Sequence, residues 1–173
     1  MSAPFGIKFY SPLESLEVLE DIGQAQYMVA APRPHPRFET YSVQATPSLG
    51  VVMVKGFSPS VENDAFGRLV RSLRQELEAQ ASKRYGLGKS VDFLLPGSIW
   101  TDDRDYVMSI TQNERKAGTI WERPSVNLPD DIEAIILDVN GKSNHAARIG
   151  LACYSRKAEL AEAEVQDMLS DLL

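Results

Sequence analysis

The chain contains 173 residues with a formal net charge of −6 at pH 7, and 43% of the residues are hydrophobic. This acidic balance argues against a nucleic-acid-binding protein, which usually carries a basic face. The single cysteine, Cys153, excludes an internal disulfide and fits a reducing compartment. No signal peptide is expected, and no apolar run approaches the roughly 20 residues of a membrane helix. We therefore expect a cytoplasmic protein of bacterial type with no nucleic-acid or membrane partner.

Residues 1–36 are expected to form an N-terminal arm in front of a single domain over residues 37–173. Ser11-Pro12-Leu13-Glu14 resembles a helix start with proline at the first helical position, which predicts a short helix. The apolar stripe of this helix would consist of Leu13, Leu16, Leu19 and Ile22. Residues 26–31 are expected to be extended, and the prolines at 32, 34 and 36 predict a stiff linker.

The central element of the sequence is a helix expected over residues 62–84, preceded by strands over 38–46 and 49–57. Glu62 in the first turn suits the start of the helix, and Gly86 suits its end. The predicted apolar stripe is Phe66, Leu69, Val70, Leu73, Leu77 and Ala81, with Arg68, Arg71, Arg74, Gln75, Glu78 and Gln80 mostly on the other face. A stripe of this width requires a sheet to cover it.

The rest of the chain is expected to consist mainly of strands. Residues 113–118 are polar and are expected to form a turn or a short helical piece. The predicted strands cover 91–100 (interrupted at Pro96-Gly97), 106–112, 119–122, 132–139 and 147–154, and a final helix covers 156–172. The element order strand, strand, helix therefore occurs twice.

Aromatic residues on the predicted strands or at their ends are candidates for the wall of a ligand site. Trp and Tyr combine a large apolar face with a hydrogen-bond donor, as pocket walls require. Nearby carboxylates, including Asp102 and Asp105, would favour a flat cation. The candidate ligand-binding residues are Phe93, Trp100, Tyr106, Trp121 and Glu122. The alternative is that these aromatic side chains are core residues.

Other kinds of chemistry have less support in the sequence. Two histidines and one cysteine without ligand spacing predict no metal site, and the acidic segment 101–105 is expected to be a solvated turn. Cys153 and His145 could form a nucleophile pair, but the apolar strand around Cys153 favours buried packing. No glycine-rich phosphate loop is present. We expect no cofactor and assign no catalytic residue.

Two stretches resemble the GyrI-like small-molecule-binding domains, which belong to the superfamily that includes the SOUL haem-binding proteins. The first is Val43-Gln-Ala-Thr-Pro47 with Val51-Val-Met-Val-Lys-Gly56, followed by Phe66 and Leu73 on a helix. The second is Leu95-Pro-Gly97-Ser-Ile-Trp100, followed by Met108-Ser-Ile110-Thr-Gln112. The resemblance covers about residues 40–112, and after Thr119 only the element order agrees.

This resemblance implies an α+β fold. In it, a curved antiparallel sheet carries two long helices on one face, built from pseudo-repeats of strand–helix–strand–strand units. It also implies a cleft for a hydrophobic, often cationic, small molecule. Some members hydrolyse reactive compounds with a buried glutamate, but that glutamate aligns with Pro96 here, and Ile99 replaces one of two family tryptophans.

Three hypotheses follow. The first is non-catalytic or regulatory binding of a small hydrophobic or cationic molecule in an aromatic-lined cleft. The second is a hydrolase acting in the same cleft with Glu122 or Asp92 as the substitute carboxylate. The third is a protein-interaction or structural module, in which the arm docks on a partner or exchanges between the protomers of a homodimer.

Overall fold

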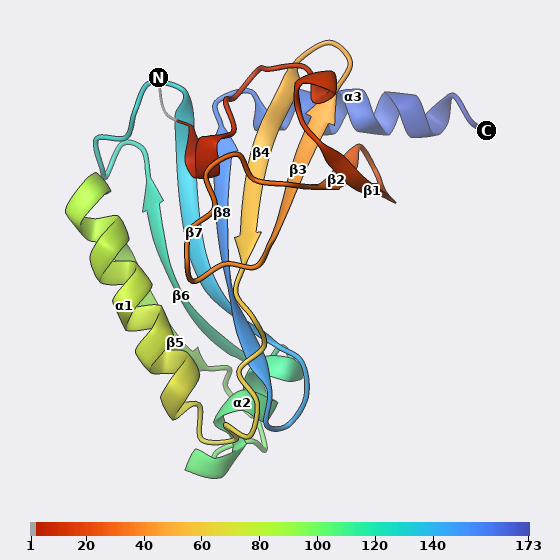
Figure 1. Ribbon diagram of the computed structural model, residues 1–173. Coiled ribbons are helices and arrows are strands. Elements are labelled where there is room, and N and C mark those ends of the chain that lie inside the picture. Colours follow the sequence, from red (N-terminus) through yellow and green to blue (C-terminus); the bar gives the residue numbers. More distant parts are fainter. Residues whose placement is uncertain (1–2) are drawn as a thin grey trace. The chain divides into compact units, whose positions relative to one another are not determined.

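A computed structural model describes residues 3–173 (Figure 1). Eight strands form one antiparallel sheet in the order β1-β2-β3-β4-β8-β7-β6-β5, so β1 and β5 are its edges. The predicted α+β class and the antiparallel sheet are confirmed. Within residues 3–173, no helix has the length and hydropathy needed to cross a membrane.

The elements have the following bounds. The strands are β1 Val18–Gly23, β2 Gln26–Val29, β3 Thr40–Thr46, β4 Gly50–Phe57, β5 Lys89–Leu94, β6 Arg115–Glu122, β7 Ile132–Gly141 and β8 Ala147–Ser155. The α-helices are α1 Arg68–Tyr85, α2 Tyr106–Thr111 and α3 Ala158–Ser170, and three short 3-10 helices cover Pro4–Gly6, Leu13–Ser15 and Asp103–Asp105.

The chain divides into two compact units. The first unit comprises Met1–Gly56, Leu128–Ile135 and Ala152–Leu173. Its core is built on β3 and β4, whose residues are almost all buried, as the nearly continuous apolar run in β4 predicts. Helix α3 contacts β3, and Ala161 and Val165 are its buried residues. The apolar side chains of Leu160, Met168 and Leu169 in this helix, and of Leu172 just after it, are exposed.

The N-terminal segment contains a hairpin where the sequence predicted a longer helix. The helix is limited to a 3-10 turn over Leu13–Ser15, and Leu19 and Ile22 of its predicted stripe belong to β1, in which every residue is exposed. The left-handed backbone of Gln24 and Ala25 forms the turn into β2. Strand β2 confirms that residues 26–29 are extended, and it pairs with β3. Pairing within the sheet satisfies the backbone here without a helix.

The second unit comprises Phe57–Asn127 and Ile136–Leu151. Helix α1 begins at Arg68, so the predicted start at residue 62 is wrong. The carboxylate of Asp64 accepts hydrogen bonds from the backbone N–H groups of Leu69 (3.0 Å) and Val70 (2.9 Å). These bonds fix the start of the helix at Arg68 instead of residue 62. Phe66 consequently precedes the helix, and it is 41% exposed.

The predicted strand over residues 106–112 is also wrong, because Tyr106–Thr111 form α2. The Asp102 carboxylate accepts a 3.0 Å hydrogen bond from the Arg104 N–H and starts the helical turn that leads into α2. Within α2, the Thr111 hydroxyl donates to the carbonyl of Val107, one turn back. Of the predicted turn over 113–118, only residues 113–114 precede β6, which begins at Arg115.

Candidate functional site

Strands β5 and β6 present two different faces within the second unit. Paired residues on antiparallel strands point to the same side of a sheet. One set of pairs is Ser90 with Thr119, Asp92 with Ala117 and Leu94 with Arg115. The other set is Lys89 with Ile120, Val91 with Gly118 and Phe93 with Lys116. We call these the helix face and the open face, because α1 bonds to residues of the first set.

Arg74 of α1 makes that connection. Its guanidinium donates to the hydroxyls of Ser90 (2.6 Å) and Thr119 (3.2 Å) and to the carbonyl of Gly118 (2.7 Å). Arg74 is only 7% exposed, although the sequence placed it on the polar face of the helix. Buried arginine is uncommon without such partners, so Arg74 fixes α1 against β5 and β6.

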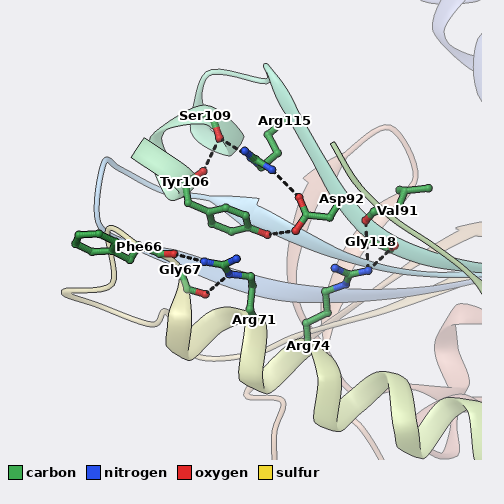
Figure 2. Close-up of polar contacts among 10 residues, drawn as sticks. All are labelled: Phe66, Gly67, Arg71, Arg74, Val91, Asp92, Tyr106, Ser109, Arg115 and Gly118. Atoms are coloured by element: carbon green, nitrogen blue, oxygen red, sulfur yellow. Dashed lines mark hydrogen bonds and ion pairs between the residues drawn. The ribbon is translucent and has the colours of Figure 1, made fainter. Parts of the chain in front are cut away.

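A polar cluster around Tyr106 lies on the helix face (Figure 2). The Tyr106 hydroxyl donates a 2.7 Å hydrogen bond to Asp92, and Arg115 binds the other oxygen of that carboxylate at 2.8 Å. The guanidinium carbon of Arg71 lies 4.1 Å from the centre of the Tyr106 ring, and that of Arg115 lies 4.8 Å from it. Arg115 also donates to the hydroxyl of Ser109 at 3.0 Å.

These surroundings keep Tyr106 neutral. Burial is the largest cause that raises the pKa of Tyr106 above its ordinary value, and the hydrogen bond to Asp92 adds to it. A ring contacted by two guanidinium groups has little surface left for a ligand. The cluster therefore joins α1, β5, α2 and β6, and Tyr106 is a fixed hydrogen-bond donor within it.

The open face contains a hollow of about 540 Å³. It is lined by residues of β5, β6 and β7, of the end of α2 and of the turn between α2 and β6. The lining residues are Lys89, Val91, Ile110, Thr111, Asn113, Arg115, Lys116, Ala117, Gly118, Thr119, Ile120, Ile136, Asp138, Val139, Asn140 and Gly141. All of them belong to the second unit.

The hollow has one apolar end and one polar end. A side chain added at Gly118 would lie 3.4 Å from the Cα of Asp138, so these two residues are neighbours on β6 and β7. Antiparallel pairing then places Ile136 beside Ile120 and Asn140 beside Lys116. Ile120 and Ile136, beside Lys89, thus mark the end with more aliphatic side chains, while Lys116 and Asn140 mark the polar end.

The five residues predicted to bind a ligand do not lie together. Tyr106 and Trp121 are buried, and the Trp121 indole donates to the carbonyl of Gly86 at 2.8 Å. Phe93 is on the open face, 48% exposed and outside the lining of the hollow. Glu122 is exposed in β6, and Trp100 lines a separate hollow.

That second hollow has a volume of about 310 Å³. Its lining residues are Ala65, Trp100, Arg104, Asp105, Met108 and Asn144. It combines an indole with one carboxylate and one guanidinium, so it carries no net charge at neutral pH.

The environment of Cys153 matches the buried packing that the sequence favours over a nucleophile pair with His145. Cys153 is 2% exposed, which fits the packing interpretation. His145 lies against Ser143 at 3.4 Å and against Glu62 at 3.9 Å. Across residues 3–173, no group of three or more His, Cys, Asp or Glu side chains is arranged to hold a metal ion.

The sequence analysis missed the residues that line the larger hollow. The signal was the alternation in residues 115–122, where Ala117, Thr119 and Trp121 alternate with Lys116, Gly118 and Ile120. The prediction of a turn over residues 113–118 conflicts with this alternation, which indicates a strand.

Comparison of the chain with protein-family models, with curated proteins and with solved structures finds no match.

Proposed function

We propose that the second unit binds a small hydrophobic molecule in the hollow on the open face, without catalysis. The observation that carries this proposal is the volume of about 540 Å³, because ligand pockets typically measure about 300–1,000 Å³. Val91, Ile120 and Ile136 supply apolar contact, and Gly118 leaves room between them. The expected aromatic-lined cleft is thereby replaced by one lined with aliphatic side chains.

The test uses N-phenyl-1-naphthylamine, an uncharged probe whose fluorescence rises in apolar surroundings. We expect saturable binding and, because bound ligand stabilises the folded state, a raised melting temperature. Ile136→Gln should weaken binding about tenfold by removing apolar contact. The matched control is Leu69→Gln, since Leu69 is 60% exposed on α1 and does not line the hollow. Equal effects of the two substitutions would reject the hollow as the site.

The family resemblance remains a proposal about ancestry. We propose that the chain is a divergent GyrI-like domain with two long helices on one face of a curved sheet. The order β3-β4-α1, repeated as β7-β8-α3, supports a pseudo-repeat. The N-terminal arm, residues 1–36, would then be an addition to a family core formed by residues 37–173. Deletion of residues 1–36 tests this division, because a core that folds alone should keep cooperative unfolding.

A cationic ligand has its best support at the smaller hollow. Trp100 offers an aromatic surface there, and Asp105 offers a carboxylate. Arg104 in the same lining opposes a cation. Quenching of Trp100 fluorescence by a flat organic cation, lost in Asp105→Asn, would move the site to this hollow.

The hydrolase alternative has two candidate carboxylates. Asp92 is bound by both Tyr106 and Arg115, so it is poorly placed to accept a proton from water. Glu122 is exposed at the end of β6. Turnover of an electrophilic compound that disappears in Glu122→Gln would support this alternative over simple binding.

The interaction alternative is favoured by one observation. The edge strand β1 exposes Val18 (41%), Leu19 (64%) and Ile22 (47%). An exposed edge strand is a template for pairing with another chain, including a second copy. Measuring the mass in solution of wild type and of Leu19→Lys tests this alternative, because the substitution should dissociate a homodimer formed through β1.

A further inference from the structure

We infer that the ligand of the open-face hollow is an acidic amphiphile whose anionic group binds at the end marked by Lys116. This inference rests on the proposed function and adds the chemical class and the orientation of the ligand. It concerns a molecule with an apolar body and one carboxylate or sulfonate group.

The first observation is the charge of the lining. Lys89, Arg115 and Lys116 are cationic, and Asp138 is the carboxylate of the set. Arg115 is engaged by Asp92 at 2.8 Å. Neither lysine side chain forms an ion pair or a side-chain hydrogen bond with any residue of the described chain, residues 3–173. Two ammonium groups without ion-pair partners, against the one carboxylate of Asp138, favour an anion over a cation.

The second observation is the polarity gradient along the hollow. Lys116 pairs with Phe93 and shares its end of the hollow with Asn140 and with the α2–β6 turn, where Asn113 lies. Lysine and amide N–H groups are the donors that a carboxylate or sulfonate accepts from. Lys89 pairs with Ile120 at the other end, where aliphatic side chains predominate. The donors thus concentrate at the Lys116 end.

The third observation is the spacing between the ends. Lys89 and Lys116 lie two register steps on either side of the Val91–Gly118 pair. At about 3.3 Å per residue, this separates the two positions by about 13 Å along the strands. A ligand of two fused or linked rings can place its anionic group near Lys116 and its apolar body against Val91 and Ile120.

The test compares two probes that differ in one group. One is 8-anilinonaphthalene-1-sulfonate, and the other is N-phenyl-1-naphthylamine, which has the same rings without the sulfonate. In dilute buffer we expect the anionic probe to bind about tenfold more tightly. Raising the salt concentration should weaken the anionic probe only, because salt screens exposed charges.

Lys116→Met should remove most of this preference. It retains an apolar stem, so the anionic probe should weaken about tenfold and the uncharged probe far less. Asn113→Gly, which suits the left-handed backbone of Asn113 (φ 58°), should weaken the anionic probe to a smaller extent. Lys83→Met in the last turn of α1 is the control and should change neither probe.

The possible failures are distinguishable. Equal affinities of the two probes for wild type, with both weakened by Ile136→Gln, would overturn the acidic ligand and leave the proposed function intact. Equal weakening of both probes by Lys116→Met would also overturn it, because the lysine would then act through packing. If neither probe binds, or if Ile136→Gln changes neither, both the inference and the proposed function fail.

Discussion

The hydroxyl of Tyr106 donates a 2.7 Å hydrogen bond to the carboxylate of Asp92, and this bond joins the short helix α2 to the edge strand β5. Edge strands lack a neighbour on one side, so side-chain contacts of this kind contribute to their placement. Asp92 also binds Arg115 of β6. The Tyr106 cluster therefore holds the strands whose opposite side forms the hollow.

Tyr106→Phe tests the strength of this bond. The ring should keep its position between Arg71 and Arg115, while Asp92 loses a neutral donor. We expect the free energy of unfolding to fall by about 1.5–3 kcal/mol, as for hydrogen bonds to charged groups. Urea denaturation measures the change. The control is Tyr27→Phe, because the Tyr27 hydroxyl has no hydrogen-bond partner among the described residues. A similar change in both variants would contradict the assignment.

The raised pKa of Tyr106 predicts a loss of stability at alkaline pH. Above the ordinary tyrosine pKa of about 10, the unfolded chain releases the proton and the folded chain keeps it. The unfolded state then binds fewer protons, so stability falls with rising pH, by at most about 1.4 kcal/mol per pH unit. Wild type should thus lose stability between about pH 10 and 11.5 relative to Tyr106→Phe. If the difference in the free energy of unfolding between wild type and Tyr106→Phe stays constant across this pH range, the pKa of Tyr106 is not raised.

Arg74→Met tests the connection between α1 and the sheet. The substitution removes the donors that reach Ser90, Thr119 and the Gly118 carbonyl. We expect a loss of about 2–4 kcal/mol in the free energy of unfolding, because the Thr119 hydroxyl and the Gly118 carbonyl are buried and would lose their charged partner. The control, Arg68→Met, removes an exposed guanidinium that lies over the Phe66 ring at 4.7 Å. It should cost less than about 1 kcal/mol.

Long periodic segments were predicted well because burial on one side dictates their pattern. The strands β3, β4, β7 and β8 and the helix α3 occur close to their predicted positions. The errors arose where local polar groups override periodicity. Asp64 delays the start of α1 by capping Leu69 and Val70, and Asp102 initiates the helical turn before α2.

The candidate site was less predictable than the fold. The aromatic side chain of Tyr106 makes it a candidate in the sequence, but its partners Asp92, Arg71 and Arg115 come from three other elements. Long-range pairing of this kind leaves no spacing signal in one sequence. The hollow depends on the β5–β6 register, which sets Lys116 opposite Phe93 on the open face. A shift of one residue would exchange the two faces.

Gly67 is required where the chain enters α1. Its φ of 69° lies in the left-handed region, and a Cβ there would overlap the Tyr106 ring. Gly97 provides a matched control, because its φ is 82° and nothing lies within 4 Å of the Cβ position. Gly97→Ala should therefore lose only the left-handed backbone cost, about 1–2 kcal/mol.

Gly67→Ala should lose more than this, since the Tyr106 ring must move and the bond to Asp92 must lengthen or break. We expect about 3 kcal/mol or more in urea denaturation, the sum of backbone strain and overpacking. Combining Gly67→Ala with Tyr106→Leu separates the two causes, because the smaller side chain relieves the overlap and leaves the backbone cost. The combined variant should lose less than the sum of the two single losses. Additive losses, or equal losses for Gly67→Ala and Gly97→Ala, would mean that the Tyr106 ring does not pack against Gly67.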